Sequence, residues 1–400
     1  MILKTSHNIR KMAKIFDYLS WRGDLNFKQT PFNPVDALIL CQLSYLPFDN
    51  IVPSPGRQAA ISISQAALIF AEMEGKKALG GYIIFRDDPE FLKILGRSSR
   101  YKDCILHSYV NHIDEEQEKQ FSAICIDIGR KTFISYRGTD VSIVGWKEDL
   151  NMSFSDAVPS QLEAASYLEA AAGNIKGPLL IGGHSKGGNL AVYAASSCSK
   201  KTCSRIKGIY SFDAPGFHHR LIKSEGFQRI QERINLFIPQ SSVIGLLFEH
   251  GKDFTVIKSS QTGLLQHELY TWEVLHNDLV KLDELTQGSR FVDKTLKDWI
   301  NGLDYGQRRV FIEALYDIFN ATQAKSLIDL GTDWFKSAGK ILHTLGNVDN
   351  STKKVIRKTL AALFEAARNN FDTLLEPINI TKINKNMPLS ISKSIPSRKK

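Results

Sequence analysis

The chain has few cysteines, and they are not arranged in pairs. Its five cysteines, among 400 residues, are scattered and lack CxxC spacing, which argues against a disulfide framework and against a zinc site. No apolar run is long enough to span a membrane, and the amino-terminal segment carries positive charge without the apolar stretch of a signal peptide. We therefore expect a cytoplasmic protein with reduced thiols.

Motifs for nucleotides and catalytic metals are also missing. The sequence contains no GxxxxGK[ST] loop, no GxGxxG fingerprint and no HExxH helix, so we expect no cofactor and no metal ion. The net charge of +9 is concentrated in residues 377–400, which carry six basic side chains, no acidic one and no aromatic ring. This composition favours a solvated, disordered tail, with weak attraction to a membrane surface or to RNA as the alternative. We expect no nucleic-acid partner.

What is present is the composition of a globular protein with a large core. Hydrophobic residues make up 43% of the chain and charged residues 23%, as in ordinary globular proteins. The length exceeds that of one average domain. We predict an α/β domain over 1–288 that includes a helical lead-in, a helical appendage over 289–376 and the basic tail over 377–400.

The hydrophobic period changes along the chain. Apolar residues recur at helical spacing in 33–46, 63–73 and 89–95, which predicts a mainly helical lead-in. Short apolar runs then alternate with helical segments, which is typical of a mostly parallel sheet with crossover helices. The order of these elements fits an α/β-hydrolase fold, with a helical lead-in and a helical appendage. The expected strands are 122–128, 132–136, 178–181, 206–212, 234–238 and 254–257, and the expected helices are 161–172 and 189–195. Beyond Gly288 the period is helical again, at 291–299, 305–319, 327–345 and 355–375.

The most informative motif is Gly183-His184-Ser185-Lys186-Gly187, between a predicted strand and a predicted helix. A nucleophile elbow needs this context, because its sharp turn leaves no room for side chains two residues before and after the serine. Ser185 is therefore a candidate nucleophile. The alternative is a glycine-rich loop with an incidental serine.

A serine nucleophile needs a histidine base, and an acid that orients this base. In an α/β-hydrolase both follow the serine in the chain. His267 is the preferred base, since it follows the last predicted strand and precedes a predicted helical run from Thr271; His250 is the reserve, and an ordinary loop histidine is the alternative. Other histidines after Ser185 are less well placed, namely His218, His219, His276 and His343.

The acid is less clear than the base. The sequence after the predicted strand 234–238 reads Pro-Gln-Ser-Ser, without a carboxylate. Asp213 directly follows the strand before it, at the carboxyl edge where such sheets build their sites. The alternatives are that Asp213 merely starts a turn before Pro215, or that Ser242 or a backbone carbonyl steadies the histidine. Two further carboxylates are less well placed, Glu249 and Asp253.

Acyl transfer also requires donors to the developing oxyanion. The amide of Lys186, directly after the nucleophile, is the first candidate. The second is Thr139, whose amide and hydroxyl follow the predicted strand that ends at Tyr136. By itself this segment is only a turn at the end of a strand.

Several of these segments resemble known families. Tyr136-Arg137-Gly138-Thr139, followed by Gly145-Trp146-Lys147-Glu148-Asp149-Leu150, resembles the Arg-Gly-Ser/Thr and Trp-x-x-Asp-Leu elements of class 3 lipases. Phe212 to Gly216 resembles their Phe-Gly-x-Pro segment with Asp in place of Gly, and His267 to Tyr270 resembles their His-x-x-Tyr. The resemblance implies that Thr139 serves the oxyanion hole.

A closer resemblance, over about 15–285, is to a bacterial lipase-like domain family of unassigned function. It rests on three segments, Asp17 to Asp24, Gly182 to Asn189 and Pro239 to Gly245. The residues at 240–242 depart from class 3 lipases, which place their acid there.

These observations favour a serine hydrolase that cleaves a small-molecule or lipid ester through an acyl-enzyme on Ser185. The missing acid motivates a second hypothesis, a catalytically silent hydrolase fold that binds a partner through its helical appendage. The third hypothesis is nucleic-acid binding through the basic tail.

Overall fold

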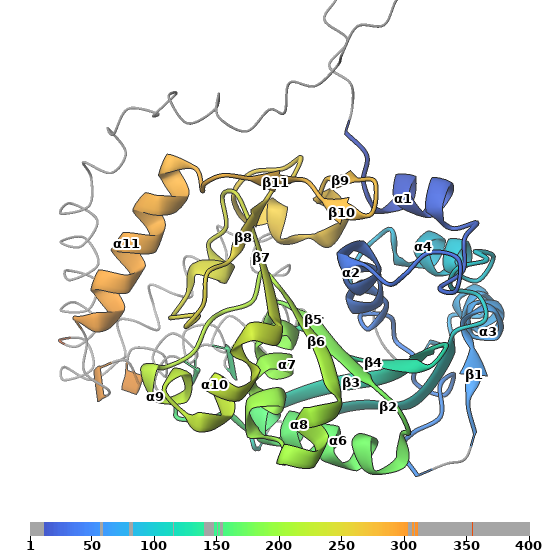
Figure 1. Ribbon diagram of the computed structural model, residues 1–400, viewed down its shortest axis with the longest axis horizontal. Coiled ribbons are helices and arrows are strands. Elements are labelled where there is room, and N and C mark those ends of the chain that lie inside the picture. Colours follow the sequence, from blue (N-terminus) through green and yellow to red (C-terminus); the bar gives the residue numbers. More distant parts are fainter. Residues whose placement is uncertain are drawn as a thin grey trace, which may run out of the picture.

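The computed structural model describes residues 12–56, 59–79, 83–114, 116–139, 148–149, 151–152, 155–302, 306–307, 309–310 and 354. In this part of the chain, helices lie on both sides of one large, mixed sheet (Figure 1). The fold is therefore α/β, as the alternating periodicity predicts. None of the described helices is long and apolar enough to cross a membrane.

The N-terminal helices lie where the sequence predicts them, with one addition. We refer to them together as the N-terminal layer, which comprises α1 (Ile15–Arg22), α2 (Pro34–Leu43), α3 (Ile63–Gly75) and α4 (Asp88–Leu95). Helix α1 is the addition. Helix α2 begins after Asn33, whose side chain accepts from the amides of Val35 and Asp36, and the side chain of Ser62 caps α3 in the same way. These polar caps satisfy amides that have no partner within the helix.

The main sheet has the order β1-β2-β3-β4-β5-β6-β7-β8-β11 among the described residues. Strands β4 to β8 run parallel, whereas β1, β2, β3 and β11 pair antiparallel with their neighbours. The predicted parallel strands are thus confirmed, while β1, β2 and β11 are additional. The strands are β1 (Ile61–Ser62), β2 (Ile105–Asp114), β3 (Lys119–Ile128), β4 (Lys131–Tyr136), β5 (Leu179–His184), β6 (Ile206–Phe212), β7 (Ile234–Pro239), β8 (Thr255–Ile257) and β11 (Lys281–Leu282).

Side chains of the central strands alternate between two cores. On β3, Ile124 and Ile126 pack in a first core with the N-terminal layer, whereas Ala123 and Cys125 pack in a second core. The alternation follows from the strand period of two. Helices on the second side, which we call the crossover layer, are α6 (Pro159–Asn174), α7 (Lys186–Ser197), α8 (Lys200–Arg205) and α10 (Glu225–Ile230). All five cysteines are buried and free.

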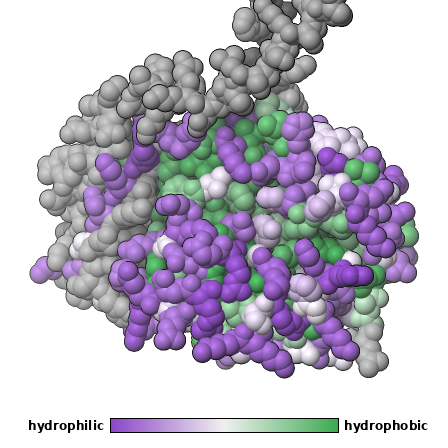
Figure 2. Space-filling model, in the orientation of Figure 1, coloured by the Kyte–Doolittle hydropathy of each residue, from purple (hydrophilic) through white to green (hydrophobic). Residues whose placement is uncertain are grey.

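The crossover layer has a hydrophilic outer surface. Figure 2 shows that the lower part of the molecule, where α8 and α10 lie in Figure 1, is largely hydrophilic. Inside, Phe227 and Ile230 of α10 are fully buried. This layer thus has the amphipathic character expected of helices that cover a sheet.

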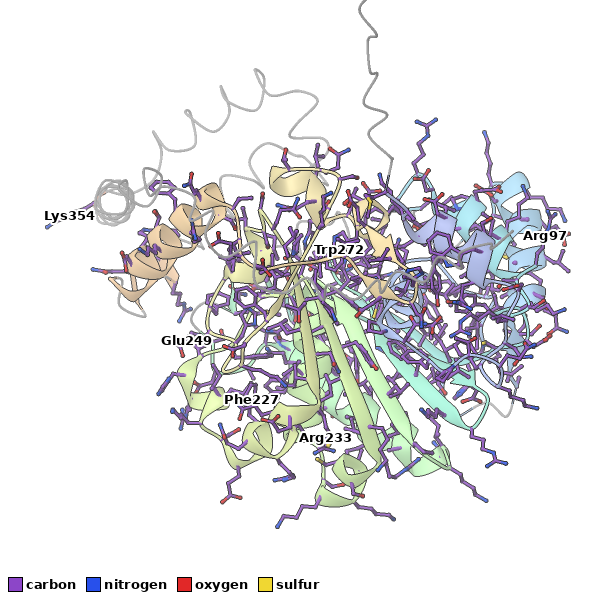
Figure 3. The ribbon with its side chains drawn as sticks, turned by 45° about the horizontal axis from the view of Figure 1, so that its top comes forward. Arg97, Phe227, Arg233, Glu249, Trp272 and Lys354 are labelled. Carbon is purple, nitrogen blue, oxygen red and sulfur yellow. The ribbon has the colours of Figure 1, made fainter. Side chains whose placement is uncertain are left out.

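The chain after His267 differs from the predicted helical run at Thr271. A short 3-10 helix, η4 (Leu269–Thr271), is followed by strands β9 (Val274–Leu275) and β10 (Asp278–Leu279), and a helix, α11 (Gln287–Asn301), begins later. The reason is tertiary packing: Trp272, at the upper end of the central strands in Figure 3, is fully buried with its ring centroid 5.9 Å from that of Phe212.

Helix α11 covers the predicted helix 291–299. Of the predicted helix 305–319, only residues 306–307 and 309–310 are described. The predicted helices 327–345 and 355–375 lie outside the described residues, and so does the tail 377–400. The domain boundary at residue 288 therefore stays a prediction.

Candidate active site

Ser185 lies at a sharp turn between β5 and α7. Its backbone has φ 57° and ψ −134°, a left-handed conformation that costs a non-glycine residue free energy and is concentrated at functional sites. Its amide donates to the carbonyl of Phe212 at 2.9 Å, so the end of β6 holds the turn. The side chain is half-buried.

The glycines around Ser185 are required by close backbone packing. A Cβ on Gly183 would lie 2.2 Å from the carbonyl carbon of Gly187, and a Cβ on Gly187 would lie 2.1 Å from the carbonyl oxygen of Tyr136. Both distances are far shorter than a van der Waals contact. The turn therefore closes only with glycine at both positions, which is the steric demand predicted from the sequence.

Asp213 and His267 are brought together from two different loops. Asp213 directly follows β6, has φ 43°, and donates its amide to the carbonyl of Phe237 at 2.8 Å. His267 ends the 3-10 helix η3 (Gly263–His267). Its Nδ1 lies 2.6 Å from Asp213 Oδ2; the carboxylate side chain is 1% exposed and the imidazole 27%. A buried carboxylate thus orients a partly exposed imidazole, as a triad requires.

The other oxygen of Asp213 is held by the loop after β7. The Ser242 hydroxyl donates to Asp213 Oδ1 at 2.5 Å, and the amide of Gly245 donates to the same oxygen at 3.1 Å. A Cβ on Gly245 would lie 2.3 Å from this oxygen, so only glycine allows the approach. The loop that lacks a carboxylate in the sequence therefore supplies hydrogen-bond donors to the carboxylate of the preceding strand.

The imidazole of His267 also lies beside the elbow. Its ring centroid is 4.4 Å from that of His184, the residue before Ser185. The ring of His267 therefore contacts both the Asp213 carboxylate and the turn that carries the serine.

Thr139 and Lys186 flank the serine on the side of β4. A Cβ on Gly138 would lie 3.1 Å from Ser185 Cβ, so the turn with Thr139 packs directly on the elbow. As the first residue of α7, Lys186 has an amide without an acceptor inside the helix, at the end where the helix dipole favours negative charge. Both amides thus belong to turns that meet at Ser185.

The side chains of these two residues lead away from the elbow, to the buried carboxylate of Glu148 and the half-buried carboxylate of Asp149. The Thr139 hydroxyl donates to Asp149 Oδ2 at 2.6 Å. Lys186 Nζ lies 3.0 Å from Glu148 Oε2 and 3.7 Å from Asp149 Oδ1. Burial raises the pKa of the Asp149 carboxyl to about 6, against the attraction of Lys186 and the Thr139 hydrogen bond. Because the hydroxyl of Thr139 already donates to Asp149, the donor that Thr139 could offer to an oxyanion is its backbone amide.

The other candidate histidines and acids have different partners. His250 Nε2 lies 2.6 Å from the carbonyl of Gly245, and His219 Nδ1 lies 3.3 Å from Glu249 Oε2 at the surface. His343 lies outside the described residues. Of the Trp-x-x-Asp-Leu element, Glu148 and Asp149 are described, whereas Trp146 and Leu150 are not.

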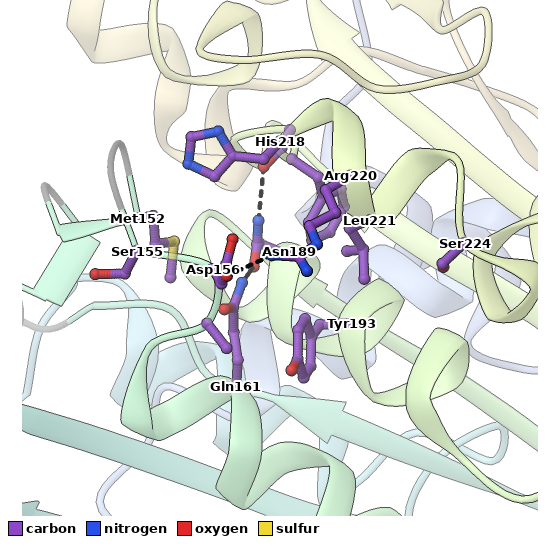
Figure 4. A pocket seen from close by; sticks show the side chains of 13 residues that line it. Met152, Ser155, Asp156, Gln161, Asn189, Tyr193, His218, Arg220, Leu221 and Ser224 are labelled. Atoms are coloured by element: carbon purple, nitrogen blue, oxygen red, sulfur yellow. Dashed lines mark hydrogen bonds and ion pairs between the residues drawn. The ribbon is translucent and has the colours of Figure 1, made fainter. Parts of the chain in front are cut away.

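A cavity of about 340 Å³ lies beside α7, the helix that starts at the elbow (Figure 4). It is lined by Asn189, one turn after Ser185, and by Gly216 and His218 beyond Asp213. None of Ser185, Asp213 and His267 lines it. The cavity is therefore separate from the candidate site. No cluster of side chains suited to a metal ion occurs in the described part of the chain.

Two comparisons with known proteins bear on this site. The model of the Mbeg1-like family, which is related to lipase-like proteins, matches residues 95–317, more than half of the chain. The match spans Thr139, Ser185, Asp213 and His267 but begins after helices α1 to α3. No curated protein matches the chain.

Proposed function

Because the chain belongs to the Mbeg1-like family, we propose that it is a serine hydrolase of the α/β-hydrolase type that cleaves a carboxylic ester. The observation that carries the proposal is the 2.6 Å contact between Asp213 and His267, beside a strained elbow serine. The lipase-like relation of the family and the resemblance of 136–139 to class 3 lipases support an ester of lipid-like character.

In the proposed acylation, His267 Nε2 takes the proton of Ser185 Oγ while this oxygen attacks the ester carbonyl carbon. Asp213 accepts from Nδ1–H of His267 and stabilises the imidazolium that forms. The amides of Lys186 and Thr139 donate to the tetrahedral oxyanion. The imidazolium then protonates the leaving alcohol, and the ester carbon stays bound to Ser185.

Deacylation repeats these steps with water. His267 takes a proton from a water molecule, whose oxygen attacks the acyl carbon, and returns the proton to Ser185 Oγ as the carboxylic acid leaves. Throughout, Ser242 and Gly245 keep one oxygen of Asp213 engaged, so that the other oxygen stays directed at His267. The missing acid after β7 motivates the silent-fold alternative, and the Asp213–His267 pair supports catalysis instead.

Covalent labelling with a fluorophosphonate tests this proposal, because the probe reacts with activated serines. We expect the folded wild-type protein to be labelled at Ser185 and Ser185→Ala to lose the label. Ser108→Ala is the matched control, since Ser108 also has a positive φ, 55°, and also lies beside a histidine, with Oγ 3.0 Å from His107 Nδ1. It should be labelled like the wild type.

Ester turnover provides the second measurement. With p-nitrophenyl esters of increasing acyl length, Ser185→Ala should lose turnover for every ester, and the control should keep it. Absence of labelling in folded wild-type protein, or equal turnover by Ser185→Ala and wild type, would contradict the proposal and favour a catalytically silent binding protein.

A further inference from the structure

A tyrosine from the N-terminal layer reaches the candidate active site. Tyr45 follows α2 and is 2% exposed. Its hydroxyl lies 2.8 Å from His184 Nδ1 and 3.4 Å from the carbonyl oxygen of His184. A Cβ on Gly138 would lie 2.2 Å from the same hydroxyl. The phenol therefore occupies the junction between the elbow and the turn that carries Thr139.

The direction of these hydrogen bonds follows from the surroundings of the phenol. Burial raises the pKa of Tyr45, so the phenol stays protonated, and the backbone of Gly138 opposes this shift by hydrogen bonding to the phenol oxygen. The phenol has one hydrogen to donate. Of its two acceptors on His184, Nδ1 is nearer than the carbonyl oxygen, at 2.8 Å against 3.4 Å, so we expect donation to Nδ1 and a proton on Nε2 of His184.

His184 is held neutral beside the proposed base. It is 1% exposed, and burial together with the nearby His267 ring keeps its pKa well below the usual range. A neutral ring leaves the positive charge of the proposed reaction on His267 alone. It also presents a fixed face to the His267 ring, at the 4.4 Å centroid distance.

We propose that Tyr45 is a positioning residue for the ester hydrolysis, which rests on the function proposed above. Its hydroxyl ties the elbow of Ser185 to the turn of Thr139, so that the nucleophile and one oxyanion donor keep their separation. Through His184 it also fixes the surface against which His267 lies. Tyr45 lies outside the matched residues 95–317, so this requirement comes from the N-terminal layer of this chain.

The test compares Tyr45→Phe with Tyr101→Phe. Tyr101 is also buried near the N-terminal layer, but its hydroxyl donates to Asp36 at 2.6 Å, in the first core. Turnover is expressed per Ser185 labelled by the fluorophosphonate, so that loss of folded protein does not lower the value. Tyr45→Phe should lower kcat about tenfold with KM within about twofold of wild type, because small displacements of catalytic groups cost rate steeply. Tyr101→Phe should leave both unchanged.

A double-mutant cycle with Thr139→Val separates positioning from general destabilisation. If Tyr45 acts through the turn of Thr139, Tyr45→Phe should cost less in the Thr139→Val background than in wild type, because interacting residues are not additive. Additive effects, or a Tyr45→Phe protein with wild-type kcat per labelled site, would overturn the proposal. Wild-type protein that fails to label would instead overturn the function itself, and the role of Tyr45 with it.

A measurement without any variant covers the case in which Tyr45→Phe does not fold. Nitrogen-15 NMR of the histidine rings in wild-type protein reports which nitrogen of His184 is protonated. We expect a neutral ring with its proton on Nε2 and an accepting Nδ1. A proton on Nδ1 would refute donation by Tyr45 to this ring, and with it the proposed control of the surface that faces His267.

Discussion

The two helical layers hold the same sheet in different ways. The crossover layer packs on it through apolar side chains such as Leu168 of α6 and Leu190 of α7, and its buried polar contacts lie at the starts of these helices, between Gln161 and Asn189 and between Lys186 and Glu148. The N-terminal layer has an apolar core too, but buried polar pairs cross it, including Arg100 with Asp36 and Asp88 with Tyr270. Tyr270 is three residues after His267, so one of these pairs leads directly to the proposed base.

This difference determines which layer can fix the positions of side chains in the proposed site. Apolar packing is non-directional and tolerates small shifts, whereas a hydrogen bond fixes distance and angle. The N-terminal layer contacts the elbow, the turn of Gly138 and the loop of His267, through Tyr45 and Asp88. We infer that the crossover layer supplies stability, while the N-terminal layer also sets the positions of the loops that form the proposed site.

The largest expected effect is on the buried ion pair of the N-terminal side. Arg100 contacts Asp36 through Nε at 2.7 Å and through Nη2 at 2.6 Å, with both side chains fully buried. Arg100→Met leaves a buried carboxylate without its cation and should lower the free energy of unfolding by about 3–5 kcal/mol in urea denaturation. Arg130→Met, at an exposed position, should stay near wild type. Equal stability of the two variants would contradict the conclusion that buried polar pairs stabilise the N-terminal side.

A substitution that creates a cavity tests the apolar packing of the crossover layer. Leu190 is 0% exposed, and Leu190→Ala should cost about 3 kcal/mol through lost burial and an unfilled space. Leu162 on α6 is 56% exposed and is the matched control. The loss at Leu190 should not change between pH 5 and pH 8, since no charge is involved. A strong pH dependence would contradict the apolar character of the core around Leu190.

Asp88 makes the N-terminal layer sensitive to pH. Burial raises the pKa of Asp88 to about 6, although Tyr270 and Gln42 donate to it. The unfolded chain releases this proton at lower pH than the folded protein, so the contribution to stability is present at low pH and is lost as the pH rises towards 6. Unfolding free energies of wild type relative to Asp88→Asn should therefore fall by about 2 kcal/mol between pH 4 and pH 7. Asp24→Asn, at an exposed position, is the control. If the difference in unfolding free energy between wild type and Asp88→Asn stays constant with pH, the pKa of Asp88 is not raised.

The smallest expected stability effect gives the sharpest comparison. Tyr270 donates to Asp88 Oδ1 at 2.7 Å, and Tyr167 of the crossover layer donates to the carbonyl of Ser108 at the same distance. Each Tyr→Phe change should cost about 1 kcal/mol in unfolding. Only Tyr270→Phe should also lower kcat per labelled Ser185, by about fivefold, because the loop of His267 loses a fixed contact. Equal kcat in both variants would show that the two layers do not differ in this role.

Much of the proposed site can be predicted from local sequence because its parts obey local rules. The glycines around Ser185 indicate a turn that has no room for side chains. Asp213 directly follows an apolar run, which places it at the carboxyl edge of the sheet. Ser242 is harder to recognise, because a serine in a loop has no signature of its own. Because Ser242 lies where a carboxylate is expected, the sequence suggests that the acid is missing. In the structure the Ser242 hydroxyl donates to Asp213, the acid that follows the neighbouring strand.

Tyr45 and the Asp88–Tyr270 pair are of a different kind. Residues 45 and 184, like residues 88 and 270, are far apart in the chain, and no local pattern relates them. The same holds for the segment after Thr271, whose apolar residues suggest a helix until Trp272 is seen to be buried in the first core.

The amino-acid sequence by itself determines the alternation of strands and helices and the steric form of the turn at Ser185, because both depend on neighbouring residues. The tertiary structure alone decides which carboxylate meets His267, which hydroxyl supports that carboxylate, and which tyrosine meets His184. These contacts depend on how the ends of the strands and the N-terminal layer pack together in space. A hydrogen bond forms only when its two atoms come within about 3 Å, and no local sequence pattern specifies that distance.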